Sequence, residues 1–221
     1  MKRLLILRPE PAASAAVAKA RERGLEAVAV PLFDIEAIEW EPPEVTSFDG
    51  LLLTSANAVR HGGDALAKLR KLKTYAVGEA TAAAAREAGF DIAAAGDAGV
   101  DRLLGSIEPD LKLLHLCGAD RREPDGAKQE IVPIAVYRSK PVDAPTFGET
   151  KGAVALIHSP RAGRRFAELV PERGSISIAA ISDPAAEAVG DGWRGVAVVG
   201  QPSDDALLAL AASLCDKPDP K

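Results

Sequence analysis

The sequence has few aromatic residues and very little cysteine. Five Phe, two Tyr and two Trp make up 4% of 221 residues, which argues against the aromatic platforms on which single-stranded nucleic acids stack. The two cysteines, Cys117 and Cys215, are too few for a disulfide framework and show no metal-binding spacing. We therefore expect a reducing compartment and no metal site.

Excess positive charge and long apolar runs are also missing. The chain carries 27 Lys and Arg against 32 Asp and Glu, a net charge of −5, which is the wrong sign for a protein that neutralises phosphates. The first apolar run stops at Arg8, too early for a signal peptide, and no run approaches the ~18 residues of a membrane span. These features predict a cytoplasmic protein that contacts neither nucleic acid nor membrane.

Short apolar runs alternate with Ala-rich stretches at helical spacing along the whole chain. Residues 4–7 predict a buried strand, 11–23 a helix and 27–30 a second strand, and residues 56–71 predict one long helix. This alternation is typical of α/β proteins with parallel sheets.

The chain also matches itself at an offset of 104 residues. LLLTSANAV at 51–59 falls on ALIHSPRAG at 155–163, and two further segment pairs, near 75 and 179 and near 99 and 203, match in the same register. Three matches without a gap indicate a duplicated unit. A fourth match places LLILRP (4–9) on LLHLCG (113–118).

The order of the matching pieces predicts the domains. The short piece precedes its main block in one copy and follows it in the other, so one domain is discontinuous. Two extended, proline-flanked connections predict a two-stranded hinge with a cleft between the domains, in a mobile monomer. We expect two doubly wound parallel-sheet (flavodoxin-like) domains: domain A at 1–32 and 152–221, domain B at 48–132, and linkers at 33–47 and 133–151.

The turns that follow the predicted strands consist of small and helix-capping residues. Ligands of doubly wound sheets bind at the carboxyl ends of the strands, where free N–H groups of helix N-termini favour anions. The sequence therefore predicts a site for an anionic ligand. The candidate binding residues are Arg8, Thr54, Ser55, Asn57, Gly78, Thr81, Gly118, Arg121 with its neighbour Arg122, Ser159, Pro160 and Ser182.

Each candidate also has a purely structural interpretation. Helix capping alone accounts for Ser55 and Ser159 about as well as binding does, and Arg121 fits a solvated surface position. Tyr137 is either a core tyrosine or a proton donor at the hinge. His115 and His158 are expected in strands as buried core residues, and no nucleotide-binding glycine motif occurs.

The motifs together resemble the uroporphyrinogen-III synthase family. They are LLILRP, LLLTSANAV, YAVGEATAAAAREAGF, LLHLCGADRR, VYRSKP, ALIHSPRAGRRF and QPSDDALLAL, in that order over nearly the whole chain. The resemblance implies a cyclising hydro-lyase of tetrapyrrole and haem biosynthesis, which converts the polycarboxylate hydroxymethylbilane to uroporphyrinogen III with inversion of ring D and loss of water. It also implies no cofactor, transient contact with hydroxymethylbilane synthase, and Tyr137 as the catalytic acid.

The sequence departs from the family pattern in places. Ser182 and Ala185 stand where glycine and threonine are usual, Cys117 replaces an arginine, and the short polar segment 118–130 predicts a reduced or absent helix. Two alternatives therefore stay open. One is a non-catalytic two-domain protein that binds a small anionic metabolite or sugar, and the other is a degenerate synthase copy retained for protein interaction.

Overall fold

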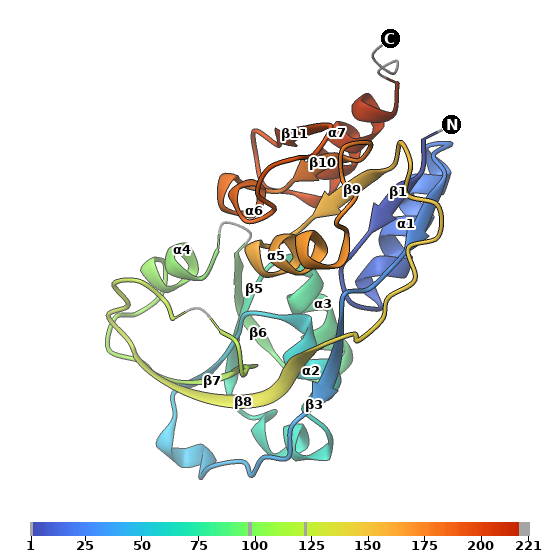
Figure 1. Ribbon diagram of the computed structural model, residues 1–221. Coiled ribbons are helices and arrows are strands. Elements are labelled where there is room, and N and C mark those ends of the chain that lie inside the picture. The colour runs from blue at the N-terminus through green and yellow to red at the C-terminus, as the bar shows by residue number, and fades with distance from the viewer. Residues whose placement is uncertain (1, 97–98, 122, 217–221) are drawn as a thin grey trace. The chain divides into compact units, whose positions relative to one another are not determined.

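The computed structural model describes residues 2–96, 99–121 and 123–216 (Figure 1). Arg122, one of the candidate residues, lies outside the described residues. The chain divides into two compact units, unit 1 with Met1–Asp34 and Pro141–Lys221 and unit 2 with Ile35–Lys140. Each unit contains its own sheet with parallel strands and helices on its faces, which confirms the predicted α/β class.

The sheet of unit 1 has five parallel strands in the order β11-β10-β9-β1-β2. Counted along the chain within this unit, the order from β2 is 2-1-3-4-5, which is the flavodoxin-like arrangement. Strands β1 and β9 are far apart in the sequence and lie side by side (Figure 1). The strands are β1 (Leu4–Ile6), β2 (Ala27–Ala29), β9 (Val154–Ile157), β10 (Ser177–Ala180) and β11 (Gly195–Val198).

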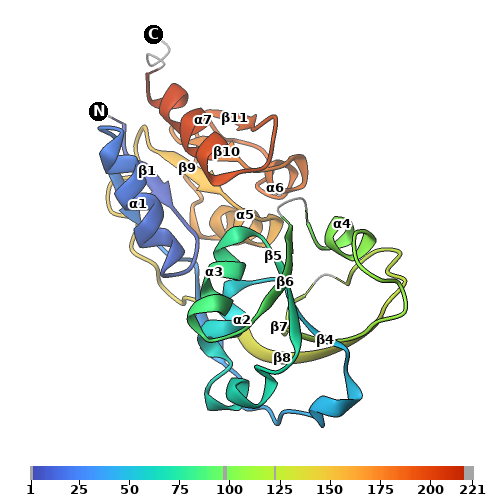
Figure 2. The ribbon, with the colours of Figure 1, turned by 180° about the vertical axis from the view of Figure 1, so that it is seen from behind.

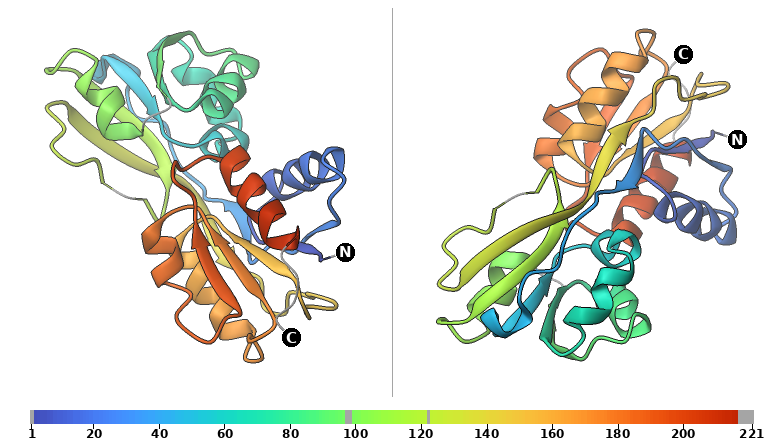
Figure 3. Two further views of the ribbon diagram at one scale, coloured as in Figure 1. Left: turned by 90° about the horizontal axis from the view of Figure 1, so that it is seen from above. Right: turned by 90° about the horizontal axis from the view of Figure 1, so that it is seen from below.

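Helices cover both faces of this sheet because successive side chains of a strand point to opposite faces. Leu5 and Ile178 pack in one core cluster with residues of α5 and α6, whereas Leu4 and Ile6 pack with residues of α1 and α7. Figures 2 and 3 show these helix pairs on the two faces. The helices are α1 (Ala12–Glu22), α5 (Pro160–Leu169), α6 (Asp183–Glu187) and α7 (Asp204–Asp216).

The sheet of unit 2 has the order β3-β8-β7-β4-β5-β6, and its strands from β8 to β6 pair in parallel. Helices α2 and α3 pack on one face and α4 on the other. Both segments expected to be interdomain linkers form strands, β3 and β8, that are neighbours at the edge of this sheet. The elements are β3 (Phe33–Ala37), β4 (Gly50–Leu53), α2 (Ala56–His61), β5 (Lys73–Val77), α3 (Glu79–Glu87), β6 (Ile92–Gly96), α4 (Val100–Gly105), β7 (Lys112–Gly118) and β8 (Glu130–Pro141).

The structure agrees with the duplication inferred from the sequence. Strands β4 and β9 begin at residues 50 and 154, and helices α2 and α5 begin at 56 and 160, an offset of 104 in both cases. Helices α3 and α6 and helices α4 and α7 keep the same offset. If β7 is numbered 1 and β8 is numbered 2, followed by β4, β5 and β6, the strands of unit 2 also lie in the order 2-1-3-4-5. The two units therefore have the same sheet topology, but the chain enters it at a different strand in each.

Two local predictions need correction. The predicted helix over 56–71 is two pieces, α2 and a 3₁₀ helix at Asp64–Leu69. They separate at Gly62 and Gly63, where Gly63 has a φ of +65° that favours glycine. His158 directly follows strand β9 and is not part of it. The segment 118–130 contains no helix in its described residues, as its polar composition predicted.

Candidate functional site

In unit 2, the turns after β4 and β5 begin helices in two different ways. The Ser55 Oγ accepts a hydrogen bond from the backbone N–H of Asn57 (3.2 Å) and so caps α2. Gly78 precedes α3 with a φ of +83°, a conformation that an L side chain rarely adopts. Thr81, in the first turn of α3, is only 5% exposed. These residues therefore have clear structural roles, in addition to the predicted binding roles.

Tyr137 lies on β8 against the carboxyl end of β7. Its ring packs so closely over Gly118 that a Cβ at that position would lie 2.8 Å from the Tyr137 Cε2 atom. The pairing of β7 with β8 shifts register between Cys117 and Gly118, which sets Tyr137 opposite Gly118. Such an irregularity changes the direction of a side chain. Gly118 is therefore needed for the position of the phenol.

The Tyr137 hydroxyl is hydrogen-bonded to Ser55, which connects the candidate acid to the turn after β4. Burial raises the pKa of Tyr137 above its ordinary value of 10, and the Ser55 hydrogen bond opposes that increase. The phenol is therefore protonated at neutral pH. The His61 ring lies 6.4 Å from the Tyr137 ring, centroid to centroid, a neighbour that sequence reasoning did not assign to the site.

Thr54 and Arg121 lie near a residue that the sequence placed in the core. The Thr54 Oγ1 and the His115 Nε2 are 2.9 Å apart. Burial, together with the charge of Arg121, lowers the pKa of His115 to about 4. Arg121 itself forms an ion pair with Glu123 (3.4 Å). The prediction of a buried His115 is confirmed, but its Nδ1 has no hydrogen-bond partner among the described residues.

In unit 1, Arg8 already has an acidic partner. The Arg8 Nη1 lies 2.5 Å from the Asp204 Oδ2 at the start of α7. The other carboxylate oxygen of Asp204 lies 3.7 Å from the His158 Nε2. The sequence indicated neither Asp204 nor His158 as a site residue, because these contacts join residues far apart in the chain. An anion that binds the Arg8 guanidinium must therefore bind beside the Asp204 carboxylate or replace it.

Ser159 and Ser182 occupy equivalent turns of unit 1 but differ in their hydrogen bonds. The Ser159 Oγ accepts from the Ala162 N–H (3.2 Å), and Pro160 is the first residue of α5. Ser182 precedes α6 without a side-chain capping bond. Ala185 is fully buried in the core beside α5. The Ser182 hydroxyl is thus left available by its helix, whereas the Ser159 hydroxyl is used.

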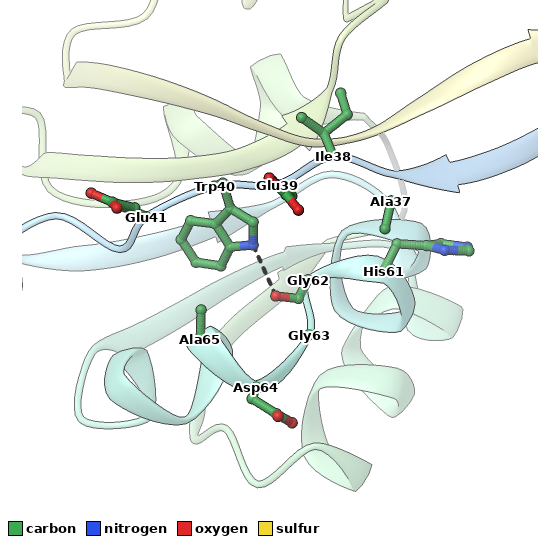
Figure 4. A pocket seen from close by; sticks show the side chains of 10 residues that line it. All are labelled: Ala37, Ile38, Glu39, Trp40, Glu41, His61, Gly62, Gly63, Asp64 and Ala65. Carbon is green, nitrogen blue, oxygen red and sulfur yellow. Dashed lines mark hydrogen bonds between the residues drawn. The ribbon is translucent and has the colours of Figure 1, made fainter.

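A pocket of about 660 Å³ in unit 2 is a poor site for an anion (Figure 4). Glu39, Glu41 and Asp64 are among the residues that line it, and the Trp40 indole donates a hydrogen bond to the Gly62 carbonyl (2.9 Å). Three acidic groups repel a polycarboxylate. Within the described ranges no cluster of three His, Cys, Asp or Glu side chains could hold a metal, and no described helix is long and apolar enough to cross a membrane.

A comparison with protein families decides the assignment. The family model of uroporphyrinogen-III synthase HemD matches residues 14–209, which include nearly all elements of both units. The chain belongs to the uroporphyrinogen-III synthase family. The resemblance noted from the sequence motifs is thereby confirmed.

Individual members of the family share 17–31% identity with this chain in three comparisons. The chain is 31% identical over 90 residues to the uroporphyrinogen-III synthase of Chlorobaculum parvum, an alignment that covers 37% of this chain and 37% of that protein. The crystal structure of uroporphyrinogen-III synthetase from Helicobacter pylori superposes with a TM-score of 0.69 at 18% identity, covering 97% of this chain and 100% of that one. A mutant uroporphyrinogen III synthase from Thermus thermophilus gives 0.53 at 17% identity, covering 98% and 100%. These two likenesses show a common fold.

Proposed function

We propose that the chain is an active uroporphyrinogen-III synthase, EC 4.2.1.75, which cyclises hydroxymethylbilane to uroporphyrinogen III with inversion of ring D and loss of water. It would act in tetrapyrrole and haem biosynthesis. The observation that carries this proposal is the match of the family model to residues 14–209. The reaction needs one proton donor and a surface for many carboxylates, and the described residues provide candidates for both.

Tyr137 is the proposed acid for the loss of the terminal hydroxyl group. Its raised pKa keeps the phenol protonated at neutral pH, so that it can donate its proton as the C–O bond breaks and water leaves. Ser55 hydrogen-bonds to the phenol oxygen and would stabilise the phenolate that remains. Ring closure later releases one proton from a pyrrole carbon. Its return to the phenolate restores Tyr137, and the overall reaction then releases only water.

The carboxylates of the substrate would be held by many small contacts. Helix N-termini and backbone N–H groups each stabilise a nearby anion by about 0.3–1 kcal/mol, so several turns acting together can hold a flexible polyanion. The proposed contacts in unit 1 are Arg8, Ser159, Pro160 and Ser182. Those in unit 2 are Thr54, Ser55, Asn57, Gly78, Thr81, Gly118 and Arg121. The domain boundaries and the hinged cleft expected from the sequence stay predictions.

We further propose that the protein works as a monomer in the cytoplasm and receives its substrate through transient contact with hydroxymethylbilane synthase. Free hydroxymethylbilane closes without enzyme and without inversion of ring D. Direct transfer from one enzyme to the other would therefore reduce the amount of substrate that is lost to spontaneous closure. Neither the departure of water nor the closure of the ring requires a cofactor or metal, because both need only proton transfer and positioning.

A coupled assay tests the proposal. Hydroxymethylbilane made by its own synthase is supplied to the protein, and the oxidised products are separated by isomer. Predominant isomer III supports the activity, and isomer I at the spontaneous rate contradicts it. In the second case, thermal stabilisation by a sugar or a simple organic acid would indicate the alternative of a binding protein, and its absence would indicate a degenerate copy.

A further inference from the structure

Unit 2 contains a small pocket at the place where unit 1 has a packed helix. The match between 4–9 and 113–118 sets His115 at the position of Ile6. In unit 1, Ile6 is fully buried in a cluster with Ala13 and Val17 of α1. In unit 2, the described part of the connection from β7 to β8 contains no helix, and a pocket of about 210 Å³ adjoins His115. A polar pocket thus replaces an apolar helix contact.

His115 lines this pocket and has a buried ring nitrogen without a hydrogen-bond partner among the described residues. The side chain is 1% exposed. The Thr54 Oγ1 lies 2.9 Å from the His115 Nε2, and the tautomer of the ring decides which of the two groups donates. In the tautomer in which Thr54 donates to Nε2, the ring proton sits on Nδ1, which is buried and unpaired within the described chain. The lowered pKa of His115, about 4, keeps the ring neutral at pH 7 and leaves one N–H to donate.

Gln129 also lines this pocket and has a buried acceptor. Its Nε2 donates to the backbone carbonyls of Leu104 (3.0 Å) and Glu108 (2.8 Å), and these two bonds fix the orientation of the amide. The Gln129 Oε1 therefore points away from them, and it is buried without a partner among the described residues. An amide oxygen can only accept. A ligand that satisfies it must present an N–H or O–H group.

We propose that this pocket binds a small carboxylate that carries a neighbouring N–H group. Its carboxylate would accept from the His115 Nδ1–H and from the Arg121 guanidinium, and its N–H would donate to the Gln129 Oε1. Glu123 competes for Arg121 through a long ion pair of 3.4 Å, which a ligand carboxylate can replace. Pro124 and Pro133 form apolar parts of the pocket lining. A single pyrrole ring with an acidic substituent has this chemistry. The binding of such a ring is inferred from the pocket alone, whereas the idea that the ring is part of the substrate rests on the proposed function.

The test is a titration of the full chain with pyrrole-2-carboxylate, followed by NMR of backbone amides. We expect saturable shifts at residues around the pocket and about tenfold weaker binding of furan-2-carboxylate, which lacks the N–H group. Arg121→Gln should weaken binding about tenfold, whereas Arg102→Gln, on the exposed side of α4, should leave it unchanged. His115→Ile, which copies unit 1, should abolish binding.

Three results would overturn the proposal: no saturable shift up to the solubility of the probe, equal affinity for the furan acid, or undiminished binding to Arg121→Gln. Arg121 is partly exposed, so this last variant is expected to fold even if His115→Ile does not. Binding is measured without turnover, so an inactive protein does not affect the result. Displacement of the probe by an oxidised linear tetrapyrrole carboxylate would assign the pocket to a substrate ring, and retention would assign it to a free monopyrrole.

Discussion

The phenol ring of Tyr137 rests on the backbone of Gly118, so closely that no side chain fits between them. A Cβ on Gly118 would lie 2.8 Å from the Tyr137 Cε2 and 2.9 Å from its Cζ. The same phenol is hydrogen-bonded to Ser55 at the start of α2. Gly118 at the end of β7 and Ser55 in the turn after the neighbouring strand β4 thus position the proposed acid.

Tyr137→Phe removes the proposed proton donor and keeps the ring. A general acid contributes about 10²-fold or more to a rate, so formation of isomer III should fall about a hundredfold while thermal stability changes little. Tyr75→Phe is the matched control, because Tyr75 is also a buried tyrosine of unit 2 with a raised pKa. Equal turnover of the two variants would eliminate the acid role of Tyr137.

Gly118→Ala tests the position of the ring while leaving its chemistry unchanged. The added methyl group must push the Tyr137 ring away from Ser55, so we expect turnover to fall about tenfold or more. Gly105→Ala is the control, since a Cβ there meets nothing within 4 Å. Isomer-III formation in the coupled assay measures both. Wild-type turnover of Gly118→Ala would show that the ring position does not matter to catalysis.

Arg8→Gln tests the proposed carboxylate contact of unit 1. Loss of one charged contact to substrate should raise KM about tenfold, equivalent to about 1.4 kcal/mol, with little change in kcat. Arg23→Gln is matched to it, because Arg23 pairs with the adjacent Asp205 at 3.0 Å and was not predicted to bind substrate. Steady-state kinetics separates the two constants. An unchanged KM for Arg8→Gln would mean that Arg8 serves only to bind Asp204.

Stability should fall in mild acid. His115 has a pKa of about 4 when folded and an ordinary value of 6.5, so between these values the unfolded chain takes up a proton that the folded chain does not. The free energy of unfolding is then fully retained above about pH 6.5 and falls as pH drops towards 4, by on the order of 3 kcal/mol for this residue.

Burial also lowers the pKa of His158, so its contribution has the same sign. Denaturant unfolding at several pH values measures the total. His115→Ile should flatten the curve clearly, whereas His61→Gln, at a less buried site, should flatten it less. If the free energy of unfolding of His115→Ile fell with pH as steeply as that of the wild type, the lowered pKa of His115 would not be the cause of the acid sensitivity.

The sequence predicted most of the fold because local patterns determine it. The 104-residue offset anticipated the matched starts of β4 with β9 and α2 with α5. The break at Gly62 and Gly63 was missed, since a glycine within a helical pattern is often tolerated. The caps at Ser55 and Ser159 followed from residue type alone.

The contacts within the candidate site were less predictable, because they join distant parts of the chain. The approach of Tyr137 to Gly118 depends on a register shift between β7 and β8 that no local pattern shows. The ion pair of Arg8 with Asp204 joins the two ends of the chain. The unpaired Nδ1 of His115 adjoins a connection from β7 to β8 whose described residues form no helix. The sequence placed His115 in the core but did not indicate that this nitrogen would lack a partner.

The most direct test of the function is the fraction of isomer III formed from fresh hydroxymethylbilane at increasing concentrations of this protein. We expect the fraction to rise with protein concentration until isomer III predominates, because enzymatic closure then becomes faster than spontaneous closure. A product that stays isomer I at every concentration, formed at the spontaneous rate by folded protein, would contradict it.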